Sequence, residues 1–114
     1  RRQFLTELSR GWVTSKELDL MKLSAFLVNT SRGPIIVEDD LIDALRNRHL
    51  AGAALDVYDV EPLPPDHPLL KLDNVLLAPH LGYSTKATLQ SFFVESVKNV
   101  QAWLTGNPIN VLGA

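Results

Sequence analysis

The sequence predicts an α/β fold in which short parallel strands alternate with helices, and two observations support this class. Three short, continuous apolar runs are typical of strands inside a parallel sheet: Phe26–Thr30, Gly52–Leu55 and Val75–Ala78. Segments with helix-capping residues or helical spacing lie before, between and after these runs. Strand–helix–strand alternation implies right-handed crossovers and helices on the faces of the sheet.

The first helix and strand are predicted near the start of the chain. Thr14–Glu17 has the spacing of a capping box, in which the threonine hydroxyl and the glutamate side chain satisfy each other's backbone amides. We therefore expect a short helix that ends at about Met21. Ala25–Asn29 follows as a buried strand, and the turn-forming residues Ser31–Pro34 end it.

A second helix is predicted from about Glu38 to Asn47. Acidic residues at 38–40 suit the positive end of a helix dipole, and Arg46 and Arg48 suit the negative end. Its core-facing stripe is expected to consist of Leu41, Ile42 and Leu45.

The remaining elements follow in the same order. A strand begins at Gly52, and the proline-rich stretch Glu61–Pro68 then forms a loop, because neither a helix nor a central strand tolerates so many prolines. After the strand Val75–Ala78, a long helix is expected to begin near Ser84 or Thr85 and to end at Gly106. Three strands form a thin sheet with an open edge, so we expect the chain to be part of a larger sheet.

Composition limits the classes of function. The chain has 114 residues, no cysteine and a net charge of −2 with both signs scattered, which gives no electrostatic case for nucleic acid or a membrane surface. No apolar stretch reaches the roughly 18 residues of a membrane-spanning helix, and no signal-peptide pattern is seen. Without cysteines or clustered metal ligands, no metal site is predicted. We expect a soluble, cytoplasmic protein.

Each apolar run leads to an ionisable residue: Arg32, Asp56 or His80. In open α/β sheets, ligands bind outside the carboxyl ends of the strands. The three side chains should therefore meet at one edge of the sheet, which predicts an enzyme site.

Each of these residues has an alternative interpretation. Arg32 can bind a carboxylate through two parallel hydrogen bonds, or it can be a surface arginine at a turn. His80 can transfer a proton, although a lone histidine is more often structural. His49 is interpreted as a helix cap or surface residue, and His67 as a solvated loop residue.

Two carboxylates complete the candidate set. Glu61 would fix the tautomer of a neighbouring imidazole and raise its pKa, or it is an ordinary loop acid. Asp56 ends an apolar strand, where an unpaired charge is costly, and its alternative role is to cap the next turn. No glycine-rich phosphate loop or nucleophile motif is present.

Five ordered motifs resemble the NAD(P)-dependent D-isomer-specific 2-hydroxyacid dehydrogenases over about residues 5–108. The motifs are Leu5-Thr6-x-x-Ser9-x-Gly11, Leu27–Gly33, Gly52–Val57, Glu61-Pro62 and Pro79–Gly82. The resemblance implies a Rossmann-like parallel sheet with flanking helices, forming an incomplete nucleotide-binding domain. Residues 1–83 would be the C-terminal half of that domain, and residues 84–114 the helix and tail that return to a substrate domain.

The resemblance also implies roles for the candidate residues. Arg32 would bind the substrate carboxylate, His80 would protonate the keto oxygen, and Glu61 would be the partner of His80. Asp56 would hold the nicotinamide carboxamide. The nicotinamide site would be lined by Thr30, Ser31, Arg32, His80, Leu81, Gly82 and Tyr83. Tyr83 departs from the serine or alanine that is usual in the family.

The implied activity is hydride transfer between NAD or NADP and a small 2-hydroxy or 2-keto acid, in a protein that forms a homodimer at full length. The isolated chain is expected to be poorly active. The alternative is a truncated, non-catalytic binding or regulatory relative. The set of Arg32, Glu61 and His80 argues against that alternative, because a scaffold has no chemical need for all three.

Overall fold

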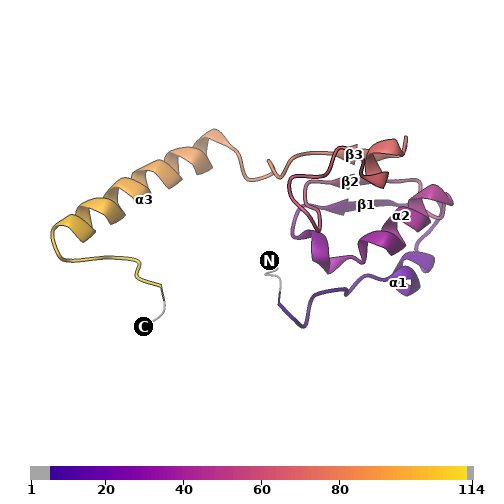
Figure 1. Cartoon of the computed structure of the whole chain (residues 1–114), viewed down its shortest axis with the longest axis horizontal. Coiled ribbons are helices and arrows are strands. Elements are labelled where there is room, and N and C mark those ends of the chain that lie inside the picture. Colours follow the sequence, from indigo (N-terminus) through magenta and orange to yellow (C-terminus); the bar gives the residue numbers. More distant parts are fainter. Residues whose placement is uncertain (1–5, 113–114) are drawn as a thin grey trace. The chain divides into compact units, whose positions relative to one another are not determined.

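The computed structural model describes residues 6–112, which form two compact units: the first ends at Leu81 and the second begins at Gly82. The first unit contains two α-helices and three strands (Figure 1): α1 (Ser15–Asp19), β1 (Phe26–Asn29), α2 (Glu38–Arg46), β2 (Gly52–Leu55) and β3 (Val75–Leu77). It also has two short 3-10 helices, η1 (Gly33–Ile35) and η2 (Pro68–Lys71). The second unit contains α3 (Lys86–Leu104).

The three strands form one parallel sheet in the order β1-β2-β3. Residues in register form rows across it, such as Leu27, Ala53 and Val75, followed by Val28, Ala54 and Leu76. The predicted α/β class and parallel sheet are therefore confirmed. Because all three strands run the same way, their carboxyl ends lie at a single edge.

One face of the sheet packs against the helices. The core joins β2 residues to side chains of α1, α2 and η2, and its largest fully buried aliphatic side chains are Leu18, Leu45, Leu50 and Leu69. The predicted stripe of α2 is confirmed, because Leu41, Ile42 and Leu45 are all buried. The capping box at Thr14 and Glu17 is present, although α1 ends two residues before Met21.

The opposite face of the sheet is exposed, which differs from the expectation of strands buried on both sides. Phe26, Val28 and Leu76 are about 70% exposed (71%, 67% and 71%). Side chains alternate between the two faces of a strand, so a continuous apolar run always places an apolar row on each. Within the described residues of the first unit, only one of these rows is covered.

The second unit is built around α3. Its N-cap is Thr85, whose hydroxyl oxygen accepts the amide hydrogen of Thr88 at 3.2 Å. Gly106 follows the C-cap with a φ of +74°, the left-handed conformation that glycine adopts at helix ends. The predicted start and end of this helix are thus confirmed. No helix in the described part of the chain is long and apolar enough to cross a membrane.

Candidate active site

The turn after β1 is held by the side chain of Asn29. This buried amide donates a hydrogen bond to the Arg32 carbonyl oxygen at 2.9 Å, and its oxygen accepts the Ser31 amide hydrogen at 3.1 Å. The turn presents the exposed side chain of Arg32, whose guanidinium donates to the Ser31 carbonyl oxygen at 2.6 Å. Sequence reasoning missed Asn29, although a polar residue at the end of an apolar run was a usable signal.

Gly33 allows this turn to pack against the segment that follows β2. A Cβ atom at Gly33 would overlap the carbonyl group of Tyr58 and would lie 2.7 Å from the Asp59 amide nitrogen. The sequence indicated that glycine serves a tight turn here. The structure adds a second requirement, which is close approach of two backbone segments.

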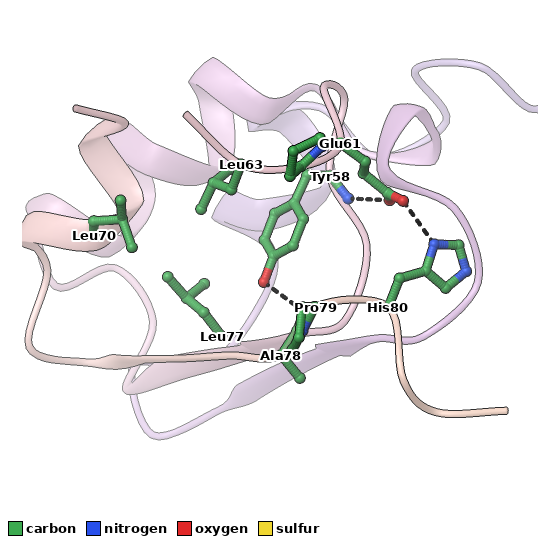
Figure 2. Close-up of a pocket in the computed structure, with 9 residues that line it drawn as sticks. Tyr58, Glu61, Leu63, Leu70, Leu77, Ala78, Pro79 and His80 are labelled. Atoms are coloured by element: carbon green, nitrogen blue, oxygen red, sulfur yellow. Dashed lines mark hydrogen bonds and ion pairs between the residues drawn. The ribbon is translucent and has the colours of Figure 1, made fainter. Parts of the chain in front are cut away.

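Glu61 and His80 form a direct pair at the edge of the sheet (Figure 2). The Glu61 Oε2 atom lies 2.7 Å from His80 Nδ1, and Glu61 Oε1 accepts the Tyr58 amide hydrogen at 3.0 Å. Burial raises the pKa of Glu61, but the His80 hydrogen bond, the Tyr58 amide and the charges of His80 and Arg32 outweigh burial and lower it overall. The carboxylate is therefore held in its ionised form beside the imidazole.

The buried Tyr58 connects the ends of β2 and β3. Its single hydroxyl hydrogen is shared between the carbonyl oxygens of Leu55, at 3.0 Å, and Ala78, at 2.9 Å. Burial raises the pKa of Tyr58, and the nearby carboxylates of Asp56 and Glu61 add to this effect. The hydroxyl therefore remains a donor. Nothing in the sequence pattern singled out this tyrosine.

Asp56 lies buried at the end of β2 and contacts the segment just after His80. Its Oδ1 atom accepts the amide hydrogen of Leu81 at 2.8 Å. Its own amide donates to the Asn29 carbonyl oxygen at 3.0 Å. His80 has a φ of +56°, which is uncommon for a residue with a side chain. The Asp56 contact helps to hold this segment in place.

A cavity of about 520 Å³ lies between the proline-rich loop and the end of β3. Figure 2 shows Glu61 and His80 on one side of it and the aliphatic side chains of Leu63, Leu70 and Leu77 toward the other. Such a combination of apolar walls and a few polar groups is typical of small-molecule sites.

The other two histidines lie outside this site. His49 is exposed, as expected, with Nδ1 3.8 Å from Asp19 Oδ1. The interpretation of His67 as a solvated residue is wrong: its side chain is only 15% exposed, and Nε2 lies 3.0 Å from Glu38 Oε1. The proline-rich loop turns this ring inward, toward the first residue of α2.

The first unit brings together most of the predicted site residues. Thr30, Ser31 and Arg32 lie in the turn after β1, and the other four follow β2 or β3: Asp56, Glu61, His80 and Leu81. Gly82 and Tyr83 belong to the second unit. There the Tyr83 ring packs beside Phe92 on α3, with ring centroids 6.3 Å apart.

The donor set fits the nicotinamide end of a dinucleotide. A carboxylate offers several acceptor positions, so Asp56 can accept from a carboxamide as well as from Leu81. The His80–Glu61 pair places an imidazole beside a carboxylate, and Arg32 places a cation at the same edge of the sheet. No glycine-rich phosphate loop occurs in the given sequence.

Comparison with known proteins agrees with this geometry. Residues 3–82 match the model of the D-isomer specific 2-hydroxyacid dehydrogenase NAD-binding domain. The chain is 43% identical over 102 residues to a glyoxylate reductase of Thermofilum pendens, covering 90% of the chain and 30% of that protein. It is 38% identical over 104 residues to a hydroxypyruvate reductase of Blautia hydrogenotrophica, covering 91% and 32%.

The fold matches as well as the sequence. A solved D-isomer specific 2-hydroxyacid dehydrogenase of Xanthobacter autotrophicus superimposes with a TM-score of 0.82 at 39% identity, covering 93% of this chain and 35% of that one. The chain belongs to the D-isomer specific 2-hydroxyacid dehydrogenase family, and all but the last of the residues that match the family's NAD-binding domain lie in the first unit. It spans about a third of the length of the relatives that it matches (30% and 32%).

Proposed function

We propose that this chain supplies the proton-transfer and carboxylate-binding half of the active site of an NAD- or NADP-dependent 2-hydroxyacid dehydrogenase. The observation that carries the proposal is the 2.7 Å contact between Glu61 and His80 at the carboxyl edge of the sheet, with Arg32 close enough to lower the pKa of Glu61. The substrates are small 2-keto acids and the corresponding 2-hydroxy acids. Relatives named glyoxylate reductase and hydroxypyruvate reductase support this substrate class.

In the proposed reaction, His80 protonates the keto oxygen. Its Nδ1 atom lies 2.7 Å from Glu61 Oε2, and the proposal assigns the transferred proton to Nε2. The Glu61 carboxylate stabilises the protonated ring and fixes its orientation. Arg32 binds the substrate carboxylate through its planar guanidinium and polarises the adjacent carbonyl.

The cofactor, when bound, supplies the hydride that is added to the second carbon of the substrate. Asp56 would hold the nicotinamide carboxamide, and Thr30, Ser31 and the residues from Leu81 to Tyr83 would line its site. Solved relatives with NADPH or NAD⁺ support either cofactor. The choice between them depends on a ribose-binding residue that lies outside these motifs.

The organisation of the whole protein is part of the proposal. Residues 1–83 form the C-terminal half of the nucleotide-binding domain, and residues 84–114 carry the helix that returns to a substrate domain. The complete protein acts as a cytoplasmic homodimer.

The test replaces His80 with glutamine in the protein expressed from its complete coding sequence. Reduction of glyoxylate and hydroxypyruvate is followed by the loss of NADH or NADPH absorbance, and cofactor binding is measured by fluorescence. His80→Gln should abolish turnover and leave cofactor binding largely intact, whereas the exposed His49→Gln should match the wild type. Unchanged turnover in His80→Gln would remove His80 from the mechanism. An inactive wild type that binds the cofactor would favour the non-catalytic alternative.

A further inference from the structure

Glu38, the first residue of α2, holds two points of the segment that carries Glu61. Its Oε1 atom lies 3.0 Å from His67 Nε2, and its Oε2 atom accepts the Asp59 amide hydrogen at 3.3 Å. The Glu38 side chain is only 19% exposed and that of His67 only 15%, so the contact is shielded from water. The loop between these points, residues 59–67, contains Glu61.

The hydrogen bonds of His67 indicate which neutral tautomer of its ring these contacts require. The Leu69 amide donates to His67 Nδ1 at 3.3 Å, so that nitrogen acts as an acceptor. The hydrogen of the neutral ring is then on Nε2, where it is donated to Glu38. The contact therefore requires no positive charge on the ring. Burial and the charge of Glu38 raise the pKa of Asp59, as expected where carboxylates lie close together.

These contacts are separate from the candidate active site. Glu38 contacts neither His80 nor Arg32 in any hydrogen bond of the described residues, and α2 packs into the core through Leu41, Ile42 and Leu45. A side chain at the start of a helix that packs into the core thus contacts both ends of a loop that contains several prolines. Within this loop, Glu61 is the carboxylate that contacts His80. After His67 the chain continues directly into η2.

We propose that Glu38 and His67 are positioning residues that fix the Glu61 loop and so align Glu61 with His80. This inference rests on the proposed function, because the position of Glu61 matters for catalysis only if His80 transfers a proton. Neither residue touches substrate or cofactor. We call the contacts of Glu38 with His67 and with the Asp59 amide the Glu38 clamp. Its loss should therefore reduce the rate of the chemical step more than the binding of either ligand.

The test uses Glu38→Gln in the protein expressed from its complete coding sequence. A glutamine has the same size, but its amide cannot accept from both His67 and Asp59, since one of its two polar atoms is a donor. The conservative variant is His67→Gln, whose amide group can still donate to Glu38. His49→Ala is the matched control, because it removes an exposed histidine beside Asp19. If Glu38→Gln fails to fold, His67→Ala is measured in its place, because it removes the partner of Glu38 Oε1.

Two readouts are measured. The first is the split between kcat and KM for reduction of a 2-keto acid, and the second is hydrogen exchange of the Tyr58 amide, which donates to Glu61 at 3.0 Å. The Leu41 amide, which donates to the carbonyl oxygen of Val37, the N-cap residue of α2, serves as the internal reference for exchange. Glu38→Gln should lower kcat by about 10- to 100-fold, since small misplacements of catalytic groups have effects of this size.

In the expected result, Glu38→Gln leaves KM within about twofold and accelerates exchange at Tyr58 but not at Leu41, while His67→Gln retains most of the wild-type kcat. An unchanged kcat, or equal exchange at Tyr58 in variant and wild type, would overturn the inference. If His67→Gln lost as much kcat as Glu38→Gln does, the inference would also be overturned. If the wild type does not reduce 2-keto acids, the proposed function fails, and the exchange at Tyr58 alone decides whether the clamp holds Glu61.

Discussion

Replacing Tyr58 with phenylalanine removes one hydroxyl that connects the ends of β2 and β3. The loss of stability depends on which hydrogen bonds the carbonyl oxygens of Leu55 and Ala78 keep in the variant. The Leu55 oxygen still accepts the Ala78 amide hydrogen at 2.9 Å, and the Ala78 oxygen still accepts the His80 amide hydrogen at 3.1 Å. Neither oxygen is left without a partner. The loss is therefore that of one hydrogen bond, about 0.5–1.5 kcal/mol, rather than the larger cost of an orphaned buried group.

Urea unfolding of wild type and Tyr58→Phe in the complete protein measures this difference. With ordinary denaturant sensitivity, the midpoint should fall by less than about 1 M and the slope should not change. The raised pKa of Tyr58 means that the folded state favours the protonated hydroxyl. The contribution of Tyr58 to folding stability should then persist up to a pH equal to its ordinary pKa of 10.0. It should disappear as the pH rises through the higher pKa of the folded state. A loss above about 3 kcal/mol, or none, would refute the argument.

Two further predictions concern the turn after β1 and the acid stability of the site. Gly33→Ala forces a Cβ into the Tyr58 carbonyl and the Asp59 amide, and should destabilise the fold by about 1–3 kcal/mol in urea unfolding, as over-packing does; an unchanged midpoint would show that the two segments separate freely. The lowered pKa of Glu61 stabilises the fold at pH values above its ordinary 4.5, and this contribution is lost as the pH falls through the lower folded value. Glu61→Gln should therefore flatten the acid part of the stability profile, and a profile parallel to wild type would contradict this.

Local sequence patterns were sufficient to predict the fold of the first unit. The capping box, the acidic start of α2 and the apolar runs are local signals, and each placed its element within about two residues of the observed one. The meeting of Arg32, Asp56 and His80 at one edge also follows from parallel strands alone. The contact between Glu61 and His80 does not, because 19 residues separate them and only the tertiary fold determines the path of the proline-rich loop.

The residues that sequence reasoning missed share a physical feature. Asn29, Tyr58 and Glu38 act through hydrogen bonds whose partners lie on another element or on backbone atoms, and side-chain periodicity carries no information about such partners. His67 was misread for the same reason. A histidine among prolines has the composition of a solvated loop, and only the carboxylate of Glu38, 29 positions earlier, explains its burial.

The site therefore depends on two sets of contacts, one that follows from the direction of the strands and one that depends on individual side chains of the loop. Strand direction brings Arg32, Asp56 and His80 to one edge. This placement is hard to change, because reversing or shifting a strand would expose the core row that includes Leu55. The alignment of Glu61 depends on few contacts, at 2.7 Å to His80, 3.0 Å to the Tyr58 amide and through the Glu38 clamp. If His80 transfers a proton as proposed, variation within this fold should alter that step most readily through the loop that carries Glu61, while the sheet keeps the remaining groups in place.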